Sequence, residues 1–194
     1  DNNFFSQVIN GIESVARHKG YNVIITQSRE SYEKEVANSE HLSSRSVDGL
    51  IISLAAETRQ VDHLIKLHRK GLPIVLFDRI TDEIPTHRVI ANNYKGAYEA
   101  TRHLLEQGCR RIAHIASSDN LSITRERLEG YKQALKDAGH KSDERYIKFC
   151  PHSGMIREET QQALNELLQL TERPDAIFTA SDRLSTTTLS LLRV

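Results

Sequence analysis

The sequence has no tryptophan, few aromatic residues and no excess of charge of either sign. Aromatic residues make up 6% of the 194 residues, so aliphatic side chains must fill most of the core. The 26 Lys and Arg residues balance the 26 Asp and Glu residues. A domain that binds DNA by itself usually carries a basic excess that neutralises phosphates. The composition therefore favours a neutral ligand or a protein partner over direct contact with DNA.

Cysteine is scarce and long apolar runs are absent. Cys109 and Cys150 are too few and too far apart for a disulfide framework or a zinc site. We expect them to be free thiols in a reducing, cytoplasmic compartment. No apolar run approaches the roughly 18 residues that span a bilayer, so no membrane partner is expected. The chain starts at Asp1 without a signal peptide and resembles a fragment of a longer protein.

The sequence also lacks the motifs of common catalytic and nucleotide sites. It contains neither the G-x-G-x-x-G nor the G-x-x-x-x-G-K-[ST] phosphate loop, and no G-x-S-x-G turn. His63 and His68 are five residues apart, which indicates a solvated helix face rather than a metal site. Asn120-Leu121-Ser122 matches a glycosylation sequon, but so short a match occurs by chance. We therefore expect a protein that is not an enzyme and uses no cofactor and no metal.

Short β-branched runs alternate with longer amphipathic stretches along the chain. Buried strands are predicted at 22–26, 47–53, 73–77, 111–116, 145–149 and 175–179, with a shorter candidate at 88–91. Apolar residues at helical spacing predict helices within 5–16, 64–68, 94–105, 128–138 and 163–170, and a last helix at 181–194. This order predicts an α/β fold with parallel sheets and helices on both faces.

Several amphipathic stretches stop at a glycine, namely Gly20, Gly71, Gly108 and Gly139. Glycine just past a helix tolerates the left-handed conformation that ends many helices. A helix closes and a strand opens near 108–110, which predicts two units, residues 1–109 and residues 110–194. The first element is a helix without a leading strand, and the last helix has no strand after it. We therefore expect a fold that is incomplete at both ends.

Polar residues stand directly after several predicted strands, where ligands bind in open parallel sheets. The pairs are Gln27-Ser28, Asp78-Arg79, Asn92-Asn93 and Ser181-Asp182. Their side chains can bind hydroxyl groups in a crevice. Alternatively, Asn93, Ser181 and Asp182 cap the helices that follow. Asp78 and Arg79 can also form a local ion pair.

Two helix starts carry further candidates. Arg125 and Arg127 lie where the helix dipole disfavours positive charge. Either they form pairs within the helix, or one of them donates two hydrogen bonds to neighbouring ligand hydroxyls. Phe4 and Phe5 are either one core and one surface residue, or an apolar wall that stacks against a sugar or a base.

Taken together, these residues resemble the LacI/GalR family of repressors and the related periplasmic sugar-binding proteins. The resemblance rests on the ordered spacing of motifs that are individually weak. In chain order they are Asn2-x-Phe4-Phe5, Gly11-Ile12-Glu13, Gly20-Tyr21, Val47-Asp48-Gly49-Leu50-Ile51, Pro73-Ile74-Val75, Asp78-Arg79, Gly96-Ala97-Tyr98, His103-Leu104-Leu105, Arg111-Ile112-Ala113-His114-Ile115, Arg127-Leu128-x-Gly130-Tyr131 and Ser181-Asp182.

The resemblance implies two Rossmann-like lobes of the periplasmic-binding-protein-like type I, which close on a small effector such as a sugar or related polyol. It also implies the ligand-binding residues, which are Asn2, Phe4, Phe5, Asp78, Arg79, Arg127, Ser181 and Asp182. Asn3 stands where the family has proline in N-P-F-F, and Ser181 stands where asparagine is commoner. The later strand that carries a ligand-binding Asp is missing, so the pocket is expected to be incomplete.

The resemblance further implies an allosteric sensor in a homodimeric transcription regulator. Operator DNA would be bound only through a helix-turn-helix headpiece that this sequence lacks. The alternative is a periplasmic binding protein for sugar import. The segment from His103 to Ile115, a hydrophobic helix followed by Gly-x-Arg-Arg-Ile, favours the regulator. An enzyme on a Rossmann-like sheet is a third alternative, but no nucleophile, metal set or phosphate loop supports it.

Overall fold

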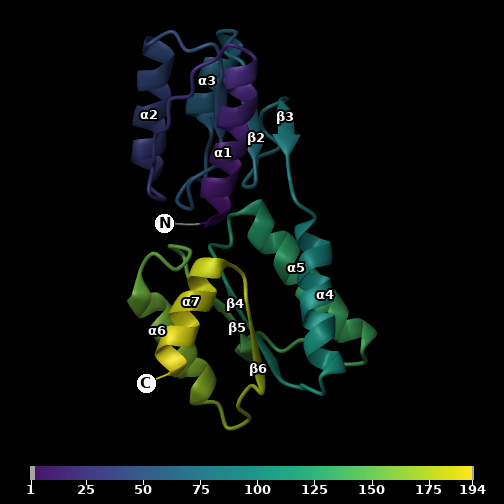
Figure 1. Ribbon diagram of the computed structural model, residues 1–194. Helices are drawn as coiled ribbons and strands as arrows, with labels where there is room; N and C mark the ends of the chain where they lie inside the picture. The colour runs from purple at the N-terminus through teal and green to yellow at the C-terminus, as the bar shows by residue number, and fades with distance from the viewer. Residues whose placement is uncertain (1–2, 194) are drawn as a thin grey trace.

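The computed structural model describes residues 3–193 and folds them into two lobes, each built around a three-stranded parallel sheet (Figure 1). The first sheet has the order β1-β2-β3, formed by β1 (Leu50–Ile52), β2 (Ile74–Phe77) and β3 (His87–Val89). The second has the order β5-β4-β6, formed by β4 (Ile112–Ala116), β5 (Ile147–Phe149) and β6 (Ala176–Thr179). All four strand pairs are parallel. The predicted α/β class is therefore confirmed, and β3 confirms the short candidate strand.

Helices flank both sheets. The first lobe carries α1 (Asn3–His18), α2 (Tyr32–Ser44) and α3 (Asp62–Arg69). The second carries α4 (Asn93–Glu106), α5 (Ser122–Asp137), α6 (Arg157–Leu168) and α7 (Asp182–Leu192), with a 3-10 turn, η1 (Glu144–Tyr146), before β5. α4 packs along α5, and α6 packs along α7 on the other side of the sheet (Figure 1). In residues 3–193, no helix is both long and apolar enough to cross a bilayer.

The glycines predicted to end helices do so. Gly20, Gly71, Gly108 and Gly139 have φ angles of 80°, 90°, 91° and 77°. These are left-handed conformations, in which a Cβ atom would be strained. The turns after α1, α3, α4 and α5 were thus predicted correctly, because a glycine at a helix end acts locally.

The strand predicted at 22–26 is wrong, since this segment is not a strand in the structure. Ile24 and Ile25 are 63% and 48% exposed. A β-branched run forms a strand only when a neighbouring strand accepts and donates its backbone hydrogen bonds. Among the described residues, β1 pairs only with β2, and no strand lies beside 22–26.

Helix α2 was not predicted from the sequence. Its fully buried side chains are Glu35 and Ser39, and both are polar. An apolar stripe is the signal from which a helix is predicted, and here polar side chains occupy the inward face. Ser31 caps this helix by accepting a hydrogen bond from the Lys34 backbone N–H.

Each lobe has its own apolar core. In the first lobe, Leu50, Leu64, Leu76 and Ile84 belong to one cluster. In the second lobe, all five residues of β4 are buried, as befits the central strand of its sheet. His114 of this strand is buried between two aromatic rings, with centroids 4.7 Å from Phe178 and 5.1 Å from Tyr131. Aliphatic and small residues fill most of the rest, as the shortage of aromatic residues predicted.

The predicted boundary between residues 109 and 110 falls after α4. However, α4 packs along α5 of the second lobe and contacts β6. We therefore propose that the chain leaves the first lobe earlier, between Val89 at the end of β3 and Asn93 at the start of α4. Figure 1 shows this crossing as an extended segment.

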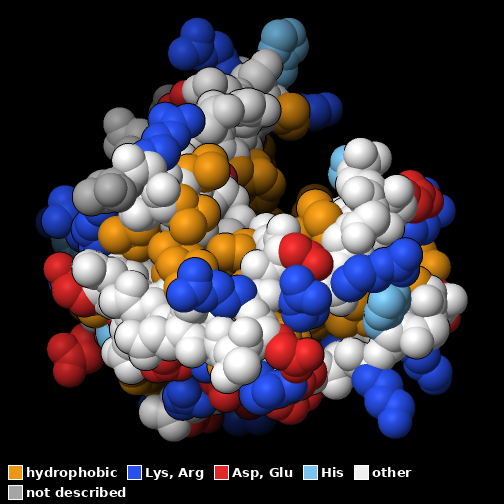
Figure 2. Space-filling view, turned by 90° about the horizontal axis from the view of Figure 1, so that it is seen from below, with side chains coloured by type: hydrophobic (Ala, Val, Ile, Leu, Met, Phe, Trp, Pro, Cys, Tyr) orange, Lys and Arg blue, Asp and Glu red, His pale blue; other side chains and the backbone are white. Residues whose placement is uncertain are grey.

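The balance of charge extends to the surface. On the face shown in Figure 2, Lys and Arg side chains alternate with Asp and Glu side chains, and no broad basic field forms. Both cysteines are free, Cys109 partly exposed and Cys150 buried. Burial raises the pKa of the Cys150 thiol to about 11, so it is protonated at neutral pH.

The close packing of α4 on α5 depends on Gly130. A Cβ atom at this position would lie 2.3 Å from the Tyr94 carbonyl oxygen. We expect Gly130→Ala to destabilise the domain, although alanine in a helix normally stabilises by about 0.5–1 kcal/mol relative to glycine. Gly96→Ala is the matched control, because its Cβ meets open space in α4. Urea denaturation checks both, and equal stabilisation by the two substitutions would contradict the close contact.

The burial of the His114 ring leads us to expect that the protein loses stability at acid pH. Burial lowers the pKa of its ring from 6.5 to about 4. Below pH 6.5 the unfolded chain takes up a proton on His114 that the folded chain does not, so this contribution to stability is present above pH 6.5 and is lost as the pH falls toward 4. Between pH 7 and pH 5 the loss from this residue is about 2 kcal/mol.

The neutral variant His114→Gln isolates this contribution. Its unfolding free energy, measured in urea at both pH values, should fall by about 2 kcal/mol less than that of the wild type. An identical fall in the two proteins would show that His114 titrates normally in the folded state.

Candidate ligand site between the lobes

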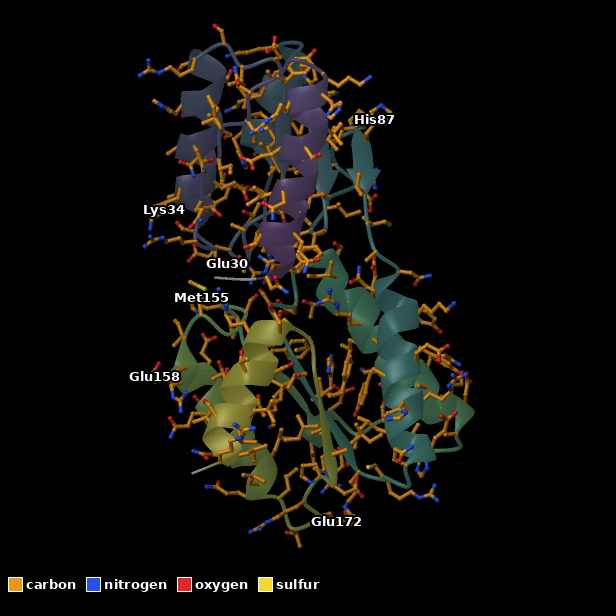
Figure 3. All side chains as sticks on the ribbon, in the orientation of Figure 1. Glu30, Lys34, His87, Met155, Glu158 and Glu172 are labelled. Atoms are coloured by element: carbon orange, nitrogen blue, oxygen red, sulfur yellow. The ribbon has the colours of Figure 1, made fainter. Side chains whose placement is uncertain are left out.

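The carboxyl ends of both sheets point toward the junction between the lobes (Figure 1). Residues that follow strands of either sheet are therefore brought together there. In Figure 3, Glu30 lies at the lower edge of the first lobe, above Met155 at the upper edge of the second.

Asp78 lies directly after β2, where its backbone has φ 57° and its N–H donates to the Val89 carbonyl over 3.0 Å. Burial raises the pKa of its carboxyl group. The positive charges of Arg79 and Arg127 oppose that rise. Asp78 therefore lies in the electrostatic field of arginines from both lobes.

Arg79 is buried and forms an ion pair with Glu30, which is 49 residues away in sequence. Its guanidinium also donates to the Leu54 carbonyl over 3.3 Å. The local pair between Asp78 and Arg79 that the sequence allowed is replaced by this more distant one. The Nε of Arg79 is buried without a hydrogen-bond partner among the described residues.

Arg127 lies in the first half of α5, and its guanidinium spans three elements. Nε and Nη2 donate to the Asn93 side-chain oxygen over 3.0 and 2.8 Å, and Nη1 donates to the Ala180 carbonyl over 2.6 Å. Burial lowers the pKa of Arg127, and Asp78 opposes this shift. Arg127 thus links α4, α5 and the end of β6 beside Asp78.

Asn93 is not the helix cap that the sequence allowed. Asn92 caps α4 by accepting from the Lys95 N–H over 2.9 Å. Asn93 is buried, and its amide donates to the Ala91 carbonyl over 3.1 Å and to the Glu126 carboxylate over 2.9 Å. Asn93 therefore orients Arg127 and ties it to the segment that crosses between the lobes.

Ser181 and Asp182 lie at the start of α7. Ser181 is the helix cap, accepting from the Leu184 N–H over 3.3 Å, so the capping alternative is confirmed for this residue. Asp182 is the first residue of the helix and is exposed. Its negative charge acts on Arg127, which places it near the same junction.

The two phenylalanines lie at the start of α1, beside the junction (Figure 1). Phe5 contacts Phe77 edge-on at 6.1 Å between centroids, directly before Asp78. Phe4 packs edge-on against Phe5 at 5.3 Å and is 45% exposed. Asn2, the remaining candidate, lies outside the described residues.

The sequence did not single out Glu30, which joins two parts of the junction. Its carboxylate pairs with Arg79 and accepts from the Ala56 N–H over 2.8 Å. Glu30 has a left-handed backbone with φ 67° and stands in a turn after an exposed segment. A charged residue in such a turn normally indicates only a solvated loop, so its partial burial depends on the tertiary structure.

The junction balances its charges. Glu30 and Asp78 are acidic, and Arg79 and Arg127 are basic. The guanidinium groups already have oxygen acceptors within the chain. Carboxylate, guanidinium and amide groups of this kind, with aromatic rings at one side, can form hydrogen bonds to hydroxyl groups and pack against a ring. Among the described residues, no group of His, Cys, Asp and Glu side chains is placed to hold a metal ion.

The fold and the junction define a two-lobed α/β ligand-binding domain. The chain belongs to the family described as periplasmic binding proteins and sugar binding domain of LacI family, which matches residues 1–193. It is similar to the transcriptional repressor PurR of Vibrio atlanticus, at 30% identity over 99% of this chain and 56% of the relative. It is also similar to the repressor CytR of Escherichia coli K12, at 30% identity over 96% of this chain and 53% of the relative.

Solved structures agree with this assignment. A protein described as a ribose operon repressor from Burkholderia thailandensis superposes with a TM-score of 0.87 at 32% identity, over 100% of this chain and 70% of that one. A complex of the transcriptional regulator CelR with cellobiose superposes with a TM-score of 0.83 at 28% identity, over 99% of this chain and 57% of that one. The chain spans about half the length of the curated relatives it matches.

Because Asp78 is partly buried, we expect its negative charge to lower the stability of the folded domain. A raised pKa means that the folded state resists ionisation, so the cost is absent at low pH and grows as the pH rises through 3.8 toward the folded value. Asparagine at this position would also tolerate the left-handed backbone. We expect Asp78→Asn to raise the melting temperature at pH 7, whereas Asp48→Asn, at an exposed position, should not. A lower melting temperature for Asp78→Asn would show that the carboxylate stabilises the lobe.

Proposed function

We propose that this chain is the effector-sensing domain of a bacterial transcription regulator, and that it binds a sugar or related polyol between its lobes. The observation that carries the proposal is the convergence of Asp78, Arg79 and Arg127 from two lobes in one electrostatic environment. The repressors and regulators among the similar proteins support it. The cellobiose of the CelR complex supports a carbohydrate ligand.

In this proposal each site residue has a role that follows from its chemistry. Asp78 accepts hydrogen bonds from ligand hydroxyls, and Arg127 donates to a pair of them. Arg79 lies beside Asp78 and is held by Glu30. Phe4 and Phe5, with Asn2, form the wall against which the apolar face of a sugar ring packs. Ser181 and Asp182 contribute from the second lobe.

Binding would act by shifting the balance between lobe arrangements. A ligand that contacts both lobes binds more tightly when they are close, and it shifts the equilibrium by that difference in affinity. In a homodimeric, cytoplasmic regulator, this change would alter operator binding by a separate DNA-binding headpiece. The protein would be a sensor and not an enzyme.

A sugar-import binding protein is the second candidate, because the family description includes periplasmic binding proteins. The relatives cited above are repressors and regulators, which favours the first candidate. The candidates differ in what the full-length gene encodes before residue 1, where a helix-turn-helix would support the regulator and a cleavable leader the transporter.

Titration calorimetry with a panel of pentoses, hexoses, disaccharides and sugar alcohols tests the ligand proposal. We expect at least one to bind saturably. Arg127→Ala should abolish that binding, and Asp78→Asn should weaken it by more than about 1 kcal/mol. Arg102→Ala, an exposed arginine on α4, is the matched control and should bind normally. Circular dichroism confirms that each variant is folded.

Binding of no member of the panel would overturn the proposed ligand class. Full affinity in folded Arg127→Ala would overturn the role of the arginine while leaving the class of ligand intact.

A further inference from the structure

The loop that follows β4 reaches across the junction and contacts the first lobe. Asn120 and Leu121 of this loop, with Ser122 at the start of α5, form the short glycosylation match in the sequence. Each of them touches the other lobe. We name these three residues, together with the first-lobe loop 55–58, the interlobe clasp.

Asn120 forms the polar part of the clasp. Its side-chain amide donates to the Ala56 carbonyl over 2.9 Å and to the Thr58 carbonyl over 2.8 Å. The amide oxygen accepts from the hydroxyl of Ser118, which is buried and fixes the orientation of the amide. Both amide hydrogens are therefore used on the opposite lobe, and no water is needed to satisfy them.

An apolar contact lies beside these hydrogen bonds. Leu121 and Ile123 of the second lobe are 4% and 5% exposed and form a buried cluster with Ala56 of the first. Ser122 adds a polar contact, since its hydroxyl accepts from the Ile80 N–H over 3.4 Å. Apolar surface buried between lobes is returned to water when they separate, so the cluster opposes opening.

Hydrogen bonds to two acidic residues of the first lobe hold loop 55–58 in place. Glu35 of α2 accepts from the Ala55 N–H over 2.6 Å and from the Thr58 hydroxyl over 3.0 Å. Glu30 accepts from the Ala56 N–H over 2.8 Å. The carbonyl groups that Asn120 contacts therefore belong to a fixed backbone, which gives the two hydrogen bonds a defined target.

Within residues 3–193 the chain passes from one lobe to the other once, between β3 and α4 (Figure 1). Within these residues, noncovalent contacts between the lobes therefore help to fix the angle between them. We propose that the interlobe clasp, centred on Asn120, holds the two lobes together in the absence of any ligand.

The clasp also adjoins the proposed effector site. Glu30 supports the loop that Asn120 contacts, and the same carboxylate pairs with Arg79. A ligand that binds Arg79 competes with Glu30 for the guanidinium group. It would thereby weaken the support that Glu30 gives to loop 55–58 of the clasp. This link depends on the proposed function, but the clasp itself does not.

The test measures the distance between the lobes without ligand. Spin labels are attached to cysteines placed at Lys34 of α2 and Glu158 of α6, two exposed positions on different lobes (Figure 3). The background carries Cys109→Ser, and Cys150 stays because it is buried. Pulsed electron–electron double resonance then gives the distribution of distances between the two spin labels for each variant.

In Asn120→Ala, the loss of two hydrogen bonds should raise the ratio of open to closed molecules by about tenfold or more. Asn120→Asp should open the lobes at least as far, because its carboxylate faces two carbonyl oxygens. Asn165→Ala, at an exposed position on α6, is the matched control and should keep the wild-type distribution. If circular dichroism shows that an Asn120 variant does not fold, Ser118→Ala replaces it. This substitution removes the hydrogen bond that orients the Asn120 amide, so the distance between the labels should increase by a smaller amount.

An unchanged distance distribution in a folded Asn120 variant would overturn the clasp. That result would leave the effector proposal standing, because calorimetry tests it separately. Conversely, a shift toward longer distances supports the clasp even if no sugar in the panel binds.

Discussion

The partial or full burial of four charged side chains beside the junction of the lobes is the constraint on which the rest of the structure depends. Arg79 and Glu30 neutralise each other, and Asp78 and Arg127 lie in one another's field. Buried charges are costly unless each has partners, so the surrounding backbone must supply acceptors such as the Leu54 and Ala180 carbonyls. The positions of β2, α5 and the ends of β1 and β6 are thereby tied together.

The same arrangement suits a site that must respond to a ligand. Asp78 is held where burial disfavours its charge and where its backbone is left-handed, so the site is not optimised for stability alone. Arg127 is oriented by Asn93, which also contacts the crossing segment through Ala91. Arg127, which we propose binds the effector, and the connection between the lobes therefore share Asn93 as a partner.

Local signals in the sequence predicted much of this fold. Five of the six strands in the described residues lie within predicted runs, and the remaining one, β3, overlaps a run that was only a candidate.

The predictions failed where residues distant in sequence determine the secondary structure of a segment. Segment 22–26 has the composition of a strand but no strand beside it, and α2 buries Glu35 and Ser39 instead of an apolar stripe. At the junction, Asp78, Arg79 and Arg127 were candidates because they follow strands or lie near a helix start, whereas Glu30 and Asn120 carry no such signal.

The sequence by itself determined the alternation of strands and helices, the glycine helix ends and the polar residues at strand ends. These depend on backbone preferences and on periodicity within a few residues. Only the tertiary structure decided that Glu30 pairs with Arg79, that Asn93 orients Arg127, and that Asn120 bonds to Ala56 and Thr58. These partners are 34 to 64 residues apart, so their contacts form only once each lobe has folded and, for Asn120, once the lobes have met.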